Sequence, residues 1–516
     1  METPTTEVIP HEPQPEKPSE PVHGPLYYLC RNLGRLIWSN RITKKIVVGA
    51  PPVLCTFIYF ASALSNPIMV EIRKRSPAIV TALMSFAVVL ALHTWAARWH
   101  RVRRLITGSI MIFWLAVMLS PDSFFHNLSL YGAYLEMDRH ELTRLPLTQH
   151  ERIYPLSMVT HIVHDRLTQS HFTVSPFETY VDPNERLWWI AQKTPAGLVN
   201  TVSLQDVSGL VQVATSSTTV DIQHHAVDFK YGRDLFILRD LGHYVLPHKL
   251  SFLDIFDKEL DRDDITYVKD AQGRWVMVMA VIDWDGIWPF CVPRFGGVFV
   301  CPQRDQGEIR LYAPDEIAKT PWLRSQNLVP ELITTFYAES WKFNQGFGGW
   351  IRNQGVTKIT KIPEDTAQQP FTLYMKDVGG HDGLFHFFAL EPAGRSAGLS
   401  KILLFDASGS TASPAAYVYD LEARGEELVG PARIAETIKA SDIHVNWKEK
   451  SGYGSFIIAE SRPLIRDHDG KRLFHWFNSV ITEQQGSGQP RVVLADPKSL
   501  AVEWLEPAAV QKLVDE

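Results

Sequence analysis

Three long apolar segments dominate the hydrophobic pattern of the first quarter of the chain. They lie near residues 46–65, 77–97 and 104–120, and the first two contain no Lys, Arg, Asp or Glu. A helix that crosses the hydrocarbon core of a bilayer needs roughly 20 apolar residues. The pattern therefore predicts an α-helical transmembrane anchor of about three spans. The third and shortest segment also fits a second interpretation, a buried core helix.

Basic residues around these segments predict an orientation. Nine Lys and Arg residues lie in the flanks at 31–45 and 98–104, whereas three lie between the first and second segments. Because cytoplasmic loops carry an excess of Lys and Arg, we expect a multi-pass protein of the bacterial inner (cytoplasmic) membrane with an extracytoplasmic C-terminal domain. If the third segment does not span, that domain falls in the cytoplasm. We expect residues 1–25, rich in Pro and Glu, to form a disordered cytoplasmic tail, and residues 26–121 to form the anchor.

Beyond residue 121 the pattern changes to short apolar runs separated by turn signals. Four Asp-containing turn motifs recur, with their aspartates spaced by 99, 101 and 90 residues, and an aromatic run precedes each of them. Asp, Ser and Gly between β-rich runs are typical of turns. The four motifs begin at Asp206, Asp305, Asp406 and Asp496, and the aromatic runs are Leu187–Ile190, Arg274–Val278, Leu384–Phe388 and Leu473–Phe477.

A helix-like stretch lies upstream of each aromatic run, at 155–167, 229–244, 329–343 and 432–440. One helix followed by two hairpins is an α+β arrangement. We therefore predict that the anchor is followed by an α+β domain of four repeated helix-plus-antiparallel-sheet units. The predicted units cover residues 150–215, 222–320, 325–425 and 430–516.

This order of helix, aromatic strand, Asp-Gly turn, strand and Asp-containing turn resembles the PepSY-type, cystatin-like module. The closest likeness is in the second unit, from GRWVMVMAVIDWDG through GGVFVCPQRDQGEIRLYAPDEI. The chain is also similar to large bacterial membrane-anchored proteins with PepSY-like repeats and no assigned function. The fourth unit departs from the pattern, with Pro497-Lys498 in its last turn. The resemblance implies inhibitory, ligand-sensing or assembly roles outside the cytoplasm and supplies no catalytic residues.

Charge separates the two parts of the chain. Residues 1–121 carry a net charge of +7, so that residues 122–516 carry −13 of the total of −6. An acidic domain is a poor candidate for binding nucleic acid, which requires clustered Lys and Arg against phosphate.

Two of the four cysteines, Cys291 and Cys301, fall in the large domain, with Gly296-Gly297 between them. A glycine pair between apolar runs is a hairpin signal, and a hairpin could bring the two sulfur atoms together. A disulfide would fit an oxidising compartment. The alternative is that both are buried free thiols on a sheet.

Candidate chemistry is sparse elsewhere. His161 and His164 would share one face of a helix and are the weak candidates for a metal site, but the chain has no His-Glu-x-x-His motif. We identify no nucleophile elbow, phosphate-binding loop or dinucleotide fingerprint. We therefore expect no cofactor and no catalytic residues. Phe347 and Trp350 lie in a glycine-rich stretch that is interpreted as a flexible, exposed contact loop.

These observations favour a membrane-anchored envelope protein whose extracytoplasmic domain binds a protein partner or takes part in an assembly, without catalysis. The expected partners are membrane lipid and an envelope protein, and the oligomeric state is left open. One alternative is a membrane-bound sensor or transporter-associated protein in which the spans are active. A second alternative is a metal-dependent envelope hydrolase.

Overall fold

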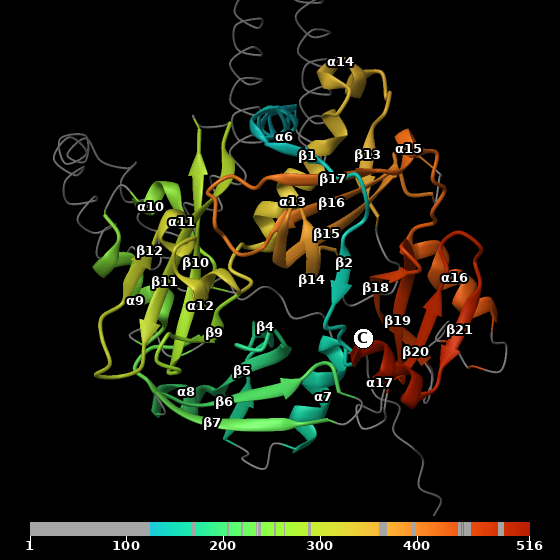
Figure 1. Cartoon of the computed structure of the whole chain (residues 1–516). Helices are drawn as coiled ribbons and strands as arrows, with labels where there is room; N and C mark the ends of the chain where they lie inside the picture. The colour runs from blue at the N-terminus through green and yellow to red at the C-terminus, as the bar shows by residue number, and fades with distance from the viewer. Residues whose placement is uncertain are drawn as a thin grey trace, which may run out of the picture. The chain divides into compact units, whose positions relative to one another are not determined.

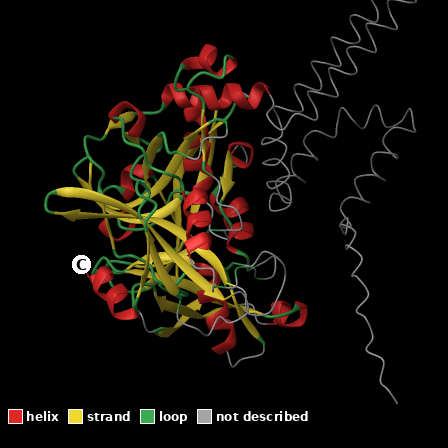
Figure 2. Cartoon of the chain, turned by 90° about the vertical axis from the view of Figure 1, so that its right-hand side faces the viewer, coloured by secondary structure: helices red, strands yellow, loops and turns green. Residues whose placement is uncertain are grey.

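The computed structural model describes residues 124–515 except for 167–170, 204–205, 218–219, 234, 236–238, 252–253, 263, 287–289, 361–368, 395–397, 442–444, 446, 448–455 and 483–489. Four β-sheets make up most of this part of the chain, and they appear as separate groups of arrows in Figure 1. Figure 2 shows that most of the helices lie on one side of the strands. We number the sheets in chain order, from the first sheet to the fourth sheet.

The predicted fold class is wrong as stated. The described residues are mostly strand with few helices, and none of their helices is long and apolar enough to cross a membrane. The longest, α6 (Phe124–Glu136), has 13 residues, which span about 20 Å against a hydrocarbon core of about 30 Å. The same finding contradicts the predicted multi-pass topology and the predicted inner-membrane localisation. The tail 1–25 and the segments 46–65, 77–97 and 104–120 lie outside the described residues.

The first sheet has the order β3-β5-β6-β7, and β4 also pairs with β5. All of its pairings are antiparallel. β7 lay inside the predicted second unit but pairs with β6, so this sheet extends beyond residue 215. Its strands are β3 (Phe172–Val174), β4 (Glu178–Val181), β5 (Leu187–Pro195), β6 (Val207–Ala214) and β7 (Ile222–Phe229).

The second sheet repeats this plan, with the order β12-β11-β10-β8 and with β9 also pairing with β10. Strand β10 (WVMVMAVIDWD) is buried along almost its whole length. A continuous apolar run of this kind is typical of a strand that is covered on both faces. The strands are β8 (Lys258–Leu260), β9 (Thr266–Lys269), β10 (Trp275–Asp285), β11 (Val292–Pro302) and β12 (Arg310–Tyr312).

The third sheet has the order β1-β17-β16-β15-β14-β2, and β13 also pairs with β15. Strands β1 and β2 follow each other in the chain but pair with opposite edges of the sheet, so that the segment joining them passes from one edge to the other. Covering an edge strand prevents unwanted pairing with other chains. The strands are β1 (Arg139–Glu141), β2 (Leu147–Gln149), β13 (Thr357–Ile359), β14 (Phe371–Val378), β15 (His381–Pro392), β16 (Lys401–Asp406) and β17 (Ala416–Asp420).

The fourth sheet is an antiparallel meander, β18-β19-β20-β21. A register shift between Ile458 and Glu460 interrupts its first pair of strands. In each of the first three sheets, two separate strands that precede a long strand in the chain both pair with it: β3 and β4 with β5, β8 and β9 with β10, and β13 and β14 with β15. The strands are β18 (Phe456–His468), β19 (Lys471–Thr482), β20 (Arg491–Ala495) and β21 (Val502–Leu505).

Helices α7, α9, α13 and α16 precede β3–β7, β8–β12, β13–β17 and β18–β21, respectively. The expected helices at 155–167, 329–343 and 432–440 are present, whereas α9 begins later than expected because Phe229 ends β7. The short helix α8 lies between β5 and β6, just before the Asp206 motif. The remaining helices are α7 (Leu156–Arg166), α8 (Leu198–Ser203), α9 (Leu241–Lys249), α10 (Asp254–Asp257), α11 (Pro314–Ile317), α12 (Pro321–Arg324), α13 (Glu331–Ser340), α14 (Gly346–Ile351), α15 (Leu421–Arg424), α16 (Pro431–Ser441) and α17 (Pro507–Asp515), with a 3₁₀ turn at Trp341–Phe343.

Three hydrophobic clusters connect the four sheets in a closed cycle. One cluster contains side chains of the first, second and third sheets. Another joins the third sheet to α16 and the fourth sheet. The last joins the fourth sheet and α17 to α7 and the first sheet. Because each sheet shares buried apolar side chains with its neighbours, the sheets stabilise one another.

Candidate functional site

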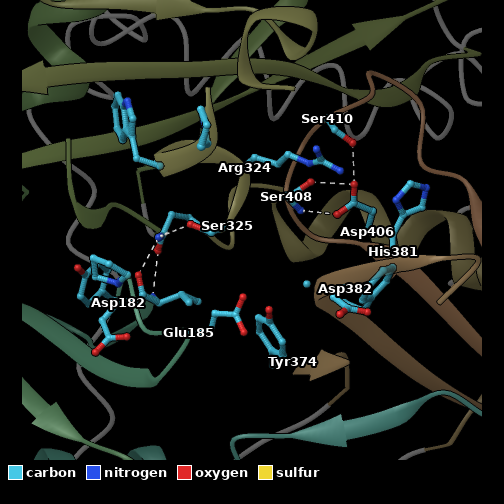
Figure 3. Close-up of a pocket in the computed structure, with 18 of the residues that line it drawn as sticks. Asp182, Glu185, Arg324, Ser325, Tyr374, His381, Asp382, Asp406, Ser408 and Ser410 are labelled. Atoms are coloured by element: carbon cyan, nitrogen blue, oxygen red, sulfur yellow. Dashed lines mark hydrogen bonds between the residues drawn. The ribbon is translucent and has the colours of Figure 1, made fainter. Parts of the chain in front are cut away.

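A cavity of about 860 Å³ lies where turns of the first, second and third sheets converge. Its walls come from the β4–β5 turn, the β9–β10 turn, α12, the β14–β15 turn and the β16–β17 loop, and Figure 3 shows its polar side chains. The charged and histidine side chains that line it are Asp182, Glu185, Lys269, Asp270, Arg324, His381, Asp382 and Asp406.

The cavity is acidic. Among its described lining residues, five carboxylates face two cations, Lys269 and Arg324. Lys269 also lies over the ring of Trp275, 4.8 Å from its centroid. Aromatic side chains add apolar wall surface between the acidic groups. They are Tyr180, Trp322, Tyr374, Phe385 and Tyr417.

Two of the five carboxylates hold turns of identical design. The Asp182 Oδ1 atom accepts hydrogen bonds from the backbone N–H groups of Asn184 and Arg186, at 2.8 and 2.9 Å. Its Oδ2 accepts from the Trp188 indole at 3.2 Å. Asp270 accepts in the same way from the N–H groups two and four residues later, both at 2.9 Å. These two carboxylates therefore serve mainly to fix the β4–β5 and β9–β10 turns.

Asp406 holds the β16–β17 loop. Its carboxylate accepts a backbone hydrogen bond from Ser408 at 2.8 Å and hydroxyl hydrogen bonds from Ser408 and Ser410, at 2.8 and 2.7 Å. In Figure 3 the Arg324 side chain extends toward this loop. The Asp406 motif was predicted from sequence as a turn, and the structure confirms that it connects two strands.

Glu185 and Asp382 have fewer donors. The Asp382 Oδ1 accepts from the backbone N–H of Asp377 at 2.9 Å. Glu185 lies beside Tyr374, whose pKa is raised by burial and by the negative charge of Glu185. Because a carboxylate can accept about four hydrogen bonds, both groups retain acceptor capacity. Figure 3 shows Glu185 beside Tyr374, with Asp382 and Asp406 across the middle of the cavity.

This arrangement suits a positively charged ligand. Carboxylates with unused acceptor capacity attract ammonium and guanidinium groups, and aromatic faces bind the same cations. No group of three or more His, Cys, Asp or Glu side chains within the described part of the chain is placed to hold a metal ion.

Cys291 and Cys301 are not joined to each other. Both are buried thiols, one just before β11 and one near its far end, and ten residues of extended strand span roughly 30 Å. The predicted hairpin at Gly296-Gly297 is wrong, because both glycines lie inside β11 at a register shift opposite Val281 and Ile282. Burial raises the pKa of the Cys301 thiol to about 12, which keeps it unreactive.

The weak metal candidates do not form a site. His161 and His164 lie on α7 with their side chains in solvent, while Met158 and Ile162 carry the buried face of that helix. The helical spacing placed the two histidines on one face as expected. The structure brings no third ligand to them among the residues it describes.

Phe347 and Trp350 do not form an exposed contact loop. They belong to the short helix α14 and are partly buried against the core. The rings of Phe347 and Trp350 lie 5.9 and 5.4 Å from that of Phe343, and Tyr131 of α6 packs on Phe347 at 5.5 Å. Both side chains therefore anchor α14 to the hydrophobic core rather than offer a binding surface.

A small crevice of about 40 Å³ gathers four further carboxylates, from Glu178, Asp261, Asp264 and Glu331. They come from β4, from the segment between β8 and β9, and from the start of α13. Arg233 lies 3.8 Å from Glu178. Desolvation, followed by the charge of Asp264, raises the pKa of the Glu331 carboxyl to about 7 and raises that of Glu178 well above its ordinary value.

Glu331 should make stability depend on pH. Its pKa is raised from 4.5 to about 7 by folding, so that the folded chain binds more protons between these values. Stability should therefore fall as the pH rises through this range. We expect Glu331→Gln to have a flatter profile of thermal unfolding midpoint between pH 4.5 and 8 than the unchanged chain. Equal slopes for the two proteins would contradict this assignment.

The sequence did not reveal Asp182, Glu185 or Arg324 as site residues. The signal was present in part, because Asp182-Pro-Asn-Glu-Arg186 and Asp270-Ala-Gln-Gly-Arg274 share a spacing of Asp and Arg around a turn. In comparisons with known proteins, the chain matches no family model, no curated protein and no solved structure.

Proposed function

We propose that the described domain is a protein-binding domain and that its acidic cavity takes up a positively charged segment of a partner. One observation carries the proposal. Five carboxylates and five aromatic side chains line a cavity of about 860 Å³, whose lining includes two cationic side chains, Lys269 and Arg324. The carboxylates of Glu185 and Asp382 keep unused hydrogen-bond acceptor capacity. A volume of this size is typical of ligand sites, which range over about 300–1,000 Å³.

The distribution of the acidic groups favours a ligand with more than one positive charge. Glu185, Asp382 and Asp406 come from three different turns and surround the cavity rather than share one wall. A single ammonium ion would contact only some of them. A short basic segment supplies Lys and Arg side chains at regular intervals and can reach several walls at once.

Long-range electrostatics act in the same direction. Residues 122–516 carry a net charge of −13. A negative field accelerates the encounter with a basic ligand and slows the encounter with an acidic one, and salt screens both effects. Binding at this cavity is therefore expected to weaken as the ionic strength rises.

The test is a titration of the purified chain with fluorescein-labelled tetra-arginine, followed by fluorescence anisotropy. We expect saturable binding that weakens as salt is raised, and no binding of labelled tetra-glutamate. Asp382→Asn should weaken tetra-arginine binding by about tenfold, since a charge-assisted hydrogen bond contributes about 1.5–3 kcal/mol. The matched control is Asp165→Asn, which removes one exposed carboxylate from α7 and should leave the affinity unchanged. Equal binding of both peptides, or equal weakening by both substitutions, would contradict the proposal.

A further inference from the structure

Two turns that line the cavity have the same backbone design but differ at one position. In the first sheet, Asp182 N–H donates to the Arg186 carbonyl at 3.0 Å, and Glu185 N–H donates to the Asp182 carbonyl at 2.9 Å. In the second sheet, Asp270 pairs in the same way with Arg274 and Gly273, at 2.9 Å each. Both are three-residue hairpin loops whose last residue adopts a left-handed conformation.

The left-handed position holds Gly273 in the second sheet, with φ +74°, and Glu185 in the first sheet, with φ +64°. Glycine adopts this conformation without steric cost, whereas a side chain brings Cβ close to the following carbonyl oxygen. The turn of the first sheet thus has glutamate at the position where the equivalent turn of the second sheet has glycine. The glutamate side chain is not needed to form the turn, since the same backbone hydrogen bonds form with glycine in the second sheet.

The side chain of Glu185 reaches the cavity rather than the turn. Its carboxylate lies beside Tyr374, which belongs to β14 of the third sheet and also lines the cavity (Figure 3). The Tyr374 ring is itself held by an edge contact with His150, with 5.1 Å between ring centroids. The carboxylate of Asp182, three residues earlier, is occupied by two backbone donors and one indole donor. Of the two acids on this turn, Glu185 therefore has the greater acceptor capacity to offer a ligand.

We infer that Glu185 binds a positively charged group of the ligand and determines the charge specificity of the cavity, an inference that rests on the proposed function. Its aromatic neighbour Tyr374 lies beside the carboxylate and adds apolar wall surface to the cavity (Figure 3). An ammonium or guanidinium group placed there would contact the carboxylate of Glu185 on one side. On the other side it would face the walls that carry Asp382 and Asp406 (Figure 3).

The decisive variant is Glu185→Gly, which gives the first turn the residue of the second. Relief of the left-handed strain should raise the thermal unfolding midpoint by about 1–2 °C, while the affinity for labelled tetra-arginine should fall by about tenfold or more. Glu185→Gln should lose the same affinity without the gain in stability, because it keeps the side chain and removes only the charge. If Glu185→Gly is more stable than the unchanged chain but binds tetra-arginine less well, Glu185 acts in ligand binding and not in stabilising the fold.

Asp305→Gly is the matched control. Asp305 also has a left-handed backbone, with φ +61°, lies in the exposed turn between β11 and β12, and carries the same charge, but does not line the cavity. We expect a similar gain in stability and an affinity for tetra-arginine within twofold of the unchanged chain.

Two outcomes are distinguished. If the unchanged chain binds no tetra-arginine, the proposed function fails and this inference fails with it. If the unchanged chain binds tetra-arginine and Glu185→Gly binds within twofold of it, the inference about Glu185 is overturned while the proposed function stands.

Discussion

Replacing Glu460 with alanine is expected to lower the free energy of unfolding by about 3–5 kcal/mol. Glu460 lies on β18, is 4 % exposed, and shares its Oε1 with two arginines. The Arg152 Nη2 and the Arg462 Nε each lie 3.5 Å from that oxygen. Without the carboxylate, two buried guanidinium groups would remain side by side with no negative charge between them.

This ionic group joins parts of the chain that are about 300 residues apart. Arg152 precedes α7, and its guanidinium also donates to the Thr372 carbonyl of β14 at 3.1 Å and lies over the Trp189 ring of β5, 4.7 Å from its centroid. Arg462 donates to the backbone carbonyl of Arg152. The group therefore fixes the first, third and fourth sheets at one point, and its loss should be felt in all three.

Chemical denaturation of the purified chain measures the effect, and Glu460→Gln provides a milder variant should the alanine protein fail to fold. The control is Glu436→Ala, which breaks a pair with Arg433 that is 2.7 Å long and solvent-exposed on both sides. Such pairs contribute little, and we expect a change within about 0.5 kcal/mol. A loss below about 1 kcal/mol for both Glu460 variants would contradict the role given to this ionic group.

Trp476→Ala should destabilise the chain by about 3–5 kcal/mol, the usual cost of deleting a buried large aromatic side chain. Trp476 is fully buried on β19, between Phe474 and Phe371, with ring centroids at 5.2 and 6.3 Å. Its indole N–H donates to the Val429 carbonyl at 3.0 Å. Trp476→Phe keeps most of the apolar volume and should cost less than half as much.

The same variant tests whether the third and fourth sheets share one core. Phe371 belongs to β14 and Trp476 to β19, within a single hydrophobic cluster. If the shared core holds the sheets together, hydrogen exchange in Trp476→Ala should accelerate in β14 and β15 as well as in β18 and β19. Acceleration confined to the fourth sheet would show that the two sheets unfold independently.

Local patterns in the sequence predicted local structure well. The four aromatic runs all lie in long strands, β5, β10, β15 and β19, because aromatic and β-branched residues favour a pleated, buried surface. Three of the four Asp motifs connect strands, whereas Asp206 follows helix α8. Helices α7, α13 and α16 lie where the apolar spacing placed them.

The errors came from signals that have two physical meanings. A glycine pair marks either a hairpin or a bulge inside a strand, and Gly296-Gly297 proved to be the second. Aromatic residues among glycines fit either an exposed loop or a packed short helix, and Phe347 and Trp350 belong to the packed helix α14. The transmembrane prediction rested on hydropathy alone, and no described helix meets the length and apolarity that spanning requires.

The candidate site could be predicted only in fragments. The motifs that contain Asp382 and Asp406 with their glycines indicate turns. Because turns occur throughout a β-rich domain, these motifs do not identify a site. That the turns beginning at Asp182, Asp270 and Asp377 line one cavity depends on how three sheets pack, which follows from contacts between residues some 90–200 positions apart. The strain at Glu185 is likewise invisible without its backbone angle.

The central claim is that these three turns act together as one binding site. Hydrogen exchange of the purified chain with and without saturating tetra-arginine tests it most directly. We expect slower exchange at 182–186, 270–274 and 377–383 together, with β20 and β21 unchanged. Protection confined to a single turn, or found only in segments outside the cavity, would contradict the claim.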